Sequence, residues 1–283
     1  MFSAFRPPES GGSTTSSWPQ QVFGLEELPE PYQPYIQDWM DKGMPVTNAT
    51  FIPYLNSKTQ ERGEYVITWH EDRIMLLSPT PFGGIKQTVI CNQDILYMDY
   101  HTFLLDCCIT LYYLEMGRRT QVQFHYNSVM ERVFIPILNI ALHQPVDYEK
   151  KILQHENPFC EALKEKSPLM FNYGKLAYRL DPVMFYYFWE CQPIKRTSDK
   201  NEYFVSLMPS GSVIIDSCDH DSVNASYLPW REIRNVQLII DRFYRIQCEV
   251  HPGRIFTIPV RKPKLQRARE FVSLWQQELT IRK

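Results

Sequence analysis

Residues 203–216 contain two strand-like runs, Tyr203-Phe-Val-Ser-Leu207 and Ser212-Val-Ile-Ile-Asp216, joined by Met208-Pro-Ser-Gly211. Runs of β-branched and aromatic residues around a turn with Pro and Gly predict a β-hairpin. The same arrangement occurs earlier, where Tyr65-Val-Ile-Thr-Trp69 and Arg73-Ile-Met-Leu-Leu-Ser78 flank a short polar turn. A pattern that occurs twice in one chain indicates an internal duplication.

The patterns that follow each hairpin come in the same order. An acidic residue and an isoleucine mark a strand start in each, at Asp94-Ile95 and at Glu232-Ile233. A further strand then leads to a Gly-Arg turn, at Gly117-Arg118 and at Gly253-Arg254, and a third strand follows. Glycine supplies the backbone freedom of a tight hairpin. These matches predict two copies of one β-rich unit.

Each copy ends in a helical pattern. In the second copy the apolar residues share one face of a 3.6-residue period. In the first copy Pro136 is expected to kink or shorten the helix. Two unrelated β-rich segments that both end in helices are the alternative interpretation. The predicted stripes are Val129, Val133, Ile137 and Ile140 in the first copy, and Ala268, Phe271, Val272, Trp275 and Leu279 in the second.

The order of these elements resembles the pleckstrin-homology-like (PH-like) family. The first copy is most similar to its bacterial branch, in which an Asp/Asn-Arg-Ile-x-Leu strand precedes an Asp/Glu-Ile strand start. The resemblance implies an α+β, mainly β fold with two tandem curved β-barrels, each capped by a C-terminal α-helix. The predicted division is a flexible tail (1–24), a first domain with an N-terminal helical extension (25–145), a helical linker (146–182) and a second domain (183–283).

Composition restricts the class of protein. The chain has 283 residues, of which 44% are apolar and 22% charged, as in globular domains. A formal charge of -2 gives no overall attraction to nucleic acid. The sequence predicts no transmembrane segment and no secretory signal, and seven cysteines, an odd number, indicate reduced thiols. We therefore expect a cytoplasmic protein, peripheral to a membrane or to a larger complex.

The sequence contains no phosphate-binding glycine loop, no nucleophile elbow and no pair of zinc-binding histidines. The segment Cys218-Asp-His-Asp221 is the nearest approach to a metal cluster, but it supplies one unpaired group where zinc needs four ligands. The histidines are scattered, and their spacing implies no Cys-His set. We predict no metal, no cofactor and no enzymatic activity.

Two groups of basic residues are the candidate sites. Lys195, Arg196 and Lys200 lie between the expected first and second strands of the second copy. In phosphoinositide-binding PH-like proteins that loop binds headgroup phosphates, so the resemblance implies a lipid or anion site here. Cations at the start of the last helix interact unfavourably with the helix dipole. An anion or an acidic partner bound there would offset this cost, so these residues are a candidate interaction surface. This second group comprises Arg261, Lys262, Lys264 and Arg267.

The leading interpretation is a non-catalytic interaction or scaffold protein that binds other protein subunits and helps to assemble a complex. Strand edges and barrel rims are able to receive an added peptide strand. The alternative is a peripheral membrane module that binds anionic lipid through the basic loop of the second copy. The alternative interpretation of the first basic group is an ordinary solvated turn, and that of the second is a solvated helix face.

Overall fold

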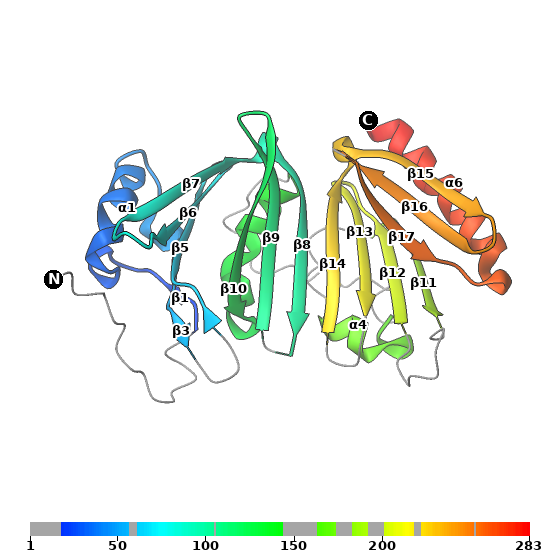
Figure 1. The fold of residues 1–283 in the computed structure, drawn as a ribbon, viewed down its shortest axis with the longest axis horizontal. Coiled ribbons are helices and arrows are strands. Elements are labelled where there is room, and N and C mark those ends of the chain that lie inside the picture. Colours follow the sequence, from blue (N-terminus) through cyan, green and yellow to red (C-terminus); the bar gives the residue numbers. More distant parts are fainter. Residues whose placement is uncertain are drawn as a thin grey trace.

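The computed structural model describes residues 18–56, 61–104, 106–143, 163–173, 183–191, 201–217, 222–251 and 253–283. Antiparallel strands dominate it, and a long helix ends the chain (Figure 1). The described strands form sheets of five, seven and three strands and one two-stranded ladder, and none of these sheets closes on itself. The expectation of a mainly β fold is therefore confirmed. Below, the first half is residues 18–143 and the second half is residues 183–283.

The five-stranded sheet belongs entirely to the first half and has the order β1-β2-β5-β6-β7. Helix α1 (Gln33–Met40) packs against it, and Ile36 and Trp39 share a buried cluster with Val66 and Met75. This helix lies in the predicted N-terminal helical extension of the first domain. The strands are β1 (Gln20–Gln21), β2 (Ala49–Ile52), β5 (Tyr65–His70), β6 (Arg73–Pro79) and β7 (Ile85–Cys91), and the ladder is β3 (Leu55–Asn56) with β4 (Glu61–Arg62).

The seven-stranded sheet contains strands from both halves, in the order β10-β9-β8-β14-β13-β12-β11. The first half contributes β8 (Ile95–Phe103), β9 (Asp106–Glu115) and β10 (Arg118–Asn127). The second half contributes β11 (Phe185–Cys191), β12 (Asn201–Leu207), β13 (Gly211–Ser217) and β14 (Ser222–Pro229). The halves therefore meet where β8 pairs with β14, a junction that the sequence did not predict.

The three-stranded sheet and the last helix complete the second half. Its strands are β15 (Ile233–Ile240), β16 (Tyr244–Val250) and β17 (Arg254–Pro259). A short 3-10 turn, η8 (Lys262–Lys264), leads into α6 (Leu265–Arg282), which packs against β15. All five apolar residues expected on one face of α6 are buried.

The two halves share small irregularities as well as their element order. A 3-10 turn precedes β8 and β15, at η5 (Asn92–Asp94) and η7 (Trp230–Glu232). In each strand the pairing register then shifts directly after the first isoleucine, Ile95 or Ile233. The second hairpin that follows, β9–β10 in the first half and β16–β17 in the second, has a glycine with positive φ in its turn, Gly117 or Gly253. Matching bulges and turns support the internal duplication more specifically than strand order does.

The helical segments after β10 differ from the expectation in one respect. A 3-10 segment, η6 (Ser128–Phe134), precedes the short helix α2 (Ile135–Ala141), and Pro136 lies in the first turn of α2, where proline is tolerated. The prediction that Val129 faces the core was wrong, because it lies in η6 and is 51% exposed. Within the predicted linker, residues 163–166 and α4 (Pro168–Tyr173) are helical, and α4 contacts β13 and β14.

The seven-stranded sheet separates two hydrophobic cores. Val213 and Ile215 on β13 belong to the core that contains α2, whereas Ile214 between them belongs to the core that contains α6. Side chains alternate between the faces of a strand, so β13 contributes to both cores. Each of these two cores therefore contains residues from both halves, and Figure 1 shows the paired strands β8 and β14 side by side.

A polar cluster binds the halves at this junction. On β8, the Asp99 carboxylate accepts a hydrogen bond of 2.6 Å from the Ser226 hydroxyl on β14. Its other oxygen lies 2.7 Å from Nη1 of Arg254 on β17. The Arg254 guanidinium also stacks over the Tyr97 and Phe256 rings. One carboxylate thus holds three strands together.

We predict that Asp99→Ala lowers the free energy of unfolding by about 2 kcal/mol, because it leaves a half-buried arginine and a buried hydroxyl without their acceptor. Urea unfolding followed by tryptophan fluorescence measures this. The matched control is Asp38→Ala, which removes an exposed pair with Lys42 and should cost less than about 0.5 kcal/mol. Equal stability of the two variants would contradict the role of Asp99.

Candidate functional site

Strand β15 presents an open backbone edge, because β16 is its only strand neighbour among the described residues. The Gln276 side-chain amide on α6 donates a 2.7 Å hydrogen bond to the Val236 carbonyl. That carbonyl therefore points away from β16. Because backbone groups alternate in direction along an antiparallel strand, Leu238 and Ile240 direct theirs to the same open side.

The side chains beside this edge are partly apolar. Ile240, at the end of β15, is 49% exposed, and Phe243 in the following turn is 63% exposed. Exposed apolar residues next to an unpaired edge are a typical site for the addition of another strand. The open edge of β15, with Ile240 and Phe243, is called the β15 edge below.

The equivalent edge in the first half is occupied. Strand β8 follows η5 as β15 follows η7, and β8 pairs with β14 over six residues, from Met98 opposite Tyr227 to Phe103 opposite Ser222. The edge of β8 in the first half therefore pairs with another strand, whereas the equivalent edge of β15 has no strand neighbour in the described part of the second half. Neither basic residues nor spacing indicated this site in the sequence.

The predicted basic group lies at the start of the last helix, and some of its residues make contacts within the protein. Lys262 and Lys264 are exposed in η8. The Arg267 guanidinium lies 5.4 Å from the centre of the Tyr187 ring, and the Tyr187 hydroxyl donates to the Lys264 carbonyl. Arg261 is half-buried at the start of the turn. These four residues remain a predicted interaction surface.

Several predicted residues lie outside the described part of the chain. These are the lipid-site candidates Lys195, Arg196 and Lys200, the segment Cys218–Asp221 and most of the N-terminal tail. Within the described residues, no group of three His, Cys, Asp or Glu side chains is arranged to hold a metal ion.

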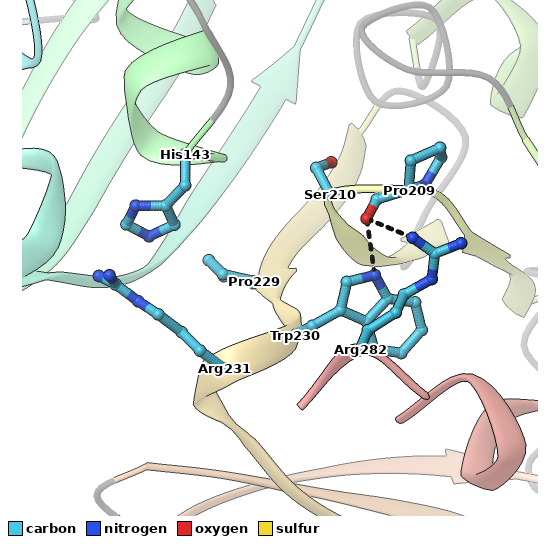
Figure 2. Close-up of a pocket in the computed structure, with 7 residues that line it drawn as sticks. All are labelled: His143, Pro209, Ser210, Pro229, Trp230, Arg231 and Arg282. Atoms are coloured by element: carbon cyan, nitrogen blue, oxygen red, sulfur yellow. Dashed lines mark hydrogen bonds between the residues drawn. The ribbon is translucent and has the colours of Figure 1, made fainter. Parts of the chain in front are cut away.

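A pocket lies between the halves, at the end of α2 and beside α6 (Figure 2). The Arg231 side chain donates to the carbonyls of Asn92, Gln93 and Ile95, so it joins η7 to η5. Arg282 donates to the Pro209 carbonyl. Each guanidinium also pairs with a glutamate, Glu232 or Glu278. Protein groups thus balance the positive charge of this pocket, which favours a structural role.

His143 faces Arg231 in this pocket (Figure 2). Burial, together with the positive charge of Arg231, lowers the pKa of His143 to about 4. The folded protein therefore keeps this imidazole neutral at pH 7. The unfolded chain takes up a proton near pH 6.5, which the folded state does not bind until about pH 4.

The free energy of unfolding should consequently fall as the pH decreases from about 6.5 to 4. His143→Gln should remove about 1 kcal/mol of that fall, a value reduced for the partial exposure of the ring. Urea unfolding at several pH values measures it. An unchanged slope in His143→Gln would refute the assignment.

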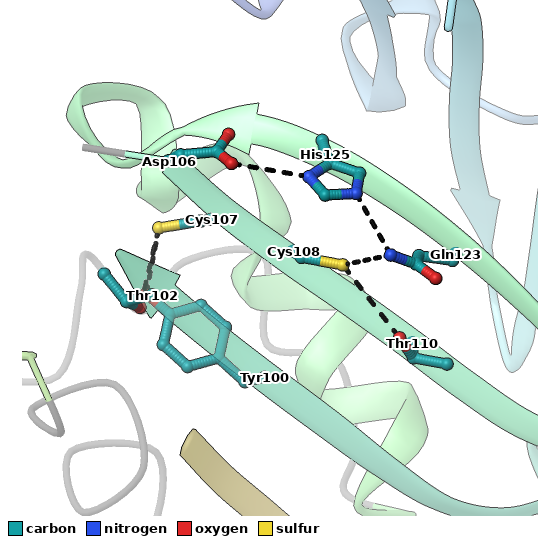
Figure 3. A network of polar contacts seen from close by, with 8 residues as sticks. All are labelled: Tyr100, Thr102, Asp106, Cys107, Cys108, Thr110, Gln123 and His125. Carbon is teal, nitrogen blue, oxygen red and sulfur yellow. Dashed lines mark hydrogen bonds and ion pairs between the residues drawn. The ribbon is translucent and has the colours of Figure 1, made fainter. Parts of the chain in front are cut away.

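Figure 3 shows a second polar network, on β9 and β10. Cys108 and His125 lie directly opposite each other in the strand register. His125 Nδ1 lies 3.6 Å from Oδ2 of Asp106, and the Gln123 amide donates a 2.9 Å hydrogen bond to Cys108 Sγ. Hydrogen bonding to Asp106, and secondly to Cys108, raises the pKa of His125 to about 9. An imidazolium thus lies between a carboxylate and a thiol.

This Cys-His-Asp set was missed from the sequence, although counting back from the turn at Gly117 would have placed Cys108 opposite His125. Such a set resembles the constellation of nucleophilic cysteines. Cys108 is however only 6% exposed and free of any disulfide. The burial of Cys108, together with the partial burial of His125 and Asp106, favours a structural role, in which the network stabilises the pairing of β9 with β10.

Because the folded pKa of His125 lies above its unfolded value, its stabilising effect is complete below about pH 6.5 and is lost as the pH rises through about 9. His125→Gln should therefore lower the free energy of unfolding by about 1 kcal/mol at pH 6 and by almost nothing at pH 10. Thermal or urea unfolding at both pH values checks this. Asp106→Asn should lose stability in the same window, and a loss that is equal at both pH values would contradict the ion pair.

Comparison with known proteins gives no identification. The chain matches no known protein family, and no curated protein matches it in sequence. In the part of the chain that the structure describes, none of the helices has the length and apolar character needed to cross a membrane.

Proposed function

We propose that this protein is a non-catalytic interaction protein, built from two PH-like repeats, that assembles with other protein subunits by adding a strand at the β15 edge. The observation that supports this proposal is a contrast between two equivalent strands: β8 pairs with β14, whereas β15 has no strand neighbour on the same edge among the described residues. A backbone edge of the same kind, at the same place in the repeat, already binds an extended strand in this molecule.

The element order supports the PH-like assignment. Each half has a hairpin and a further strand, then a 3-10 turn, three antiparallel strands and a closing helical segment. In the second half four strands precede the turn, and α6 covers the core between the two groups of strands. The apolar face of a sheet must be buried against another element, and an amphipathic helix buries it.

The chemistry of the β15 edge suits an extended peptide. Backbone groups of Leu238 and Ile240 point to the open side, beyond Val236, which α6 buries, and would form the hydrogen bonds of an added antiparallel strand. Alternate side chains of that strand would lie beside the exposed Ile240 on one face. Backbone pairing supplies affinity in this mode, and side-chain contacts supply specificity.

We predict that a photo-crosslinking residue at Gln237 on β15 forms adducts with a partner in native extract. The matched position is Thr257 on β17, which lies in the same rung of the sheet and should form few adducts. Ile240→Pro removes an N–H from the open side and should reduce adducts at least about tenfold, whereas Ile255→Pro, on the opposite edge, should not.

These variants leave the hydrogen bonds between β15 and β16 intact, so circular dichroism should show the same fold for both. Adducts that form equally at Gln237 and Thr257, or that persist in Ile240→Pro, would overturn the proposed binding mode. Adducts at neither position would overturn the proposed function.

A further inference from the structure

The internal duplication pairs elements of the two halves. Strand β15 corresponds to β8, because both follow a 3-10 turn and carry a bulge after the first isoleucine. Strand β7 corresponds to β14, because both end directly before that turn. The chain therefore forms one junction of this type, β8 with β14, and retains the two equivalent strands, β7 and β15, as sheet edges in the described part.

Carrying the β8–β14 register over to β15 and β7 gives a compatible set of neighbours. Met98 opposite Tyr227 becomes Val236 opposite Val89. The polar pair of Asp99 and Ser226 becomes Gln237 opposite Thr88, which again places two hydrogen-bonding side chains together. Lys86 is the only charged residue of β7 and would lie opposite an isoleucine, so like charges do not meet directly.

Both free edges carry apolar side chains that a partner would cover. Val89 on β7 is 43% exposed and Ile240 on β15 is 49% exposed. Exposed β-branched residues on unpaired edges favour association unless the edge is protected. The protection visible at β15 is helix α6, which packs against the strand, buries Val236 completely and donates the Gln276 amide to its carbonyl. An incoming strand would pair with Leu238 and Ile240, beyond the buried Val236, where the edge is partly exposed.

We infer that the strand added at the β15 edge comes from a second copy of this chain, whose β7 pairs antiparallel with β15. This inference rests on the proposed function and names its partner. The contact repeats between molecules the junction that β8 and β14 form within one molecule. Because the two surfaces differ, each copy has one acceptor edge and one donor edge, so assembly proceeds head to tail into a ring or filament.

Sedimentation velocity of the full chain tests the inference. The interface is small, so we expect reversible association within about 10 to 100 μM. Gln276→Ala removes the α6 side chain that donates a hydrogen bond to the edge at Val236, and should tighten association about fivefold, the equivalent of one hydrogen bond. A wild-type chain that stays monomeric throughout this range would overturn the inference.

Two edge variants make the test specific. Ile240→Pro blocks the acceptor edge and Gln87→Pro blocks the donor edge, and each variant alone should be monomeric. An equimolar mixture retains one intact β15 and one intact β7, and should form a 1:1 dimer that grows no further. Restored dimerisation also shows that both variants fold. Ile255→Pro, on the β17 edge, should assemble like the wild type.

The outcomes separate the two proposals. If both variants still self-associate, or if the mixture remains monomeric, the second-copy inference is wrong. A different protein crosslinked at Gln237 would then leave the proposed function standing with another partner. If the full chain neither self-associates nor crosslinks at Gln237, both proposals fail.

Discussion

The backbone edge of β8 requires a hydrogen-bonding partner, and the rest of the structure depends on β14 supplying it. This pairing makes one seven-stranded sheet out of strands from the two halves. It brings Ser226 and Arg254 to Asp99, and the two hydrophobic cores that this sheet separates both include residues from both halves. The two halves therefore share one sheet and the cores on its two faces.

Strand pairing also explains why the chain supports assembly without an obvious chemical motif. Most of the bonding capacity of an edge lies in the backbone, which every residue carries. Specificity then depends on which edges remain open and on what covers them. In this protein helix α6 covers the first part of β15 and buries Val236, whereas Ile240 at the end of the strand stays exposed.

Much of the fold could be predicted because its determinants are local. The hairpins around residues 70–72 and 208–211, the glycine turns and the buried face of α6 follow from short-range patterns. Strands β7 and β14 were missed because polar residues such as Lys86, Gln87 and Asn224 interrupt their apolar alternation. The β8–β14 junction was not predictable, since backbone pairing between distant segments leaves no side-chain signature. The candidate site follows from that junction, so it could not be predicted either.

The position of β14 late in the sequence has a consequence for synthesis. Asp99 is synthesised before its partners Ser226 and Arg254, which follow it by 127 and 155 residues. At roughly 5–20 residues per second, the nascent first half is exposed without its neighbour for on the order of 10 s. During that interval the unpaired backbone edge of β8 is exposed and able to pair with other chains, which favours aggregation. Substitutions in residues 222–229 should therefore impair the yield of a segment that was translated long before them.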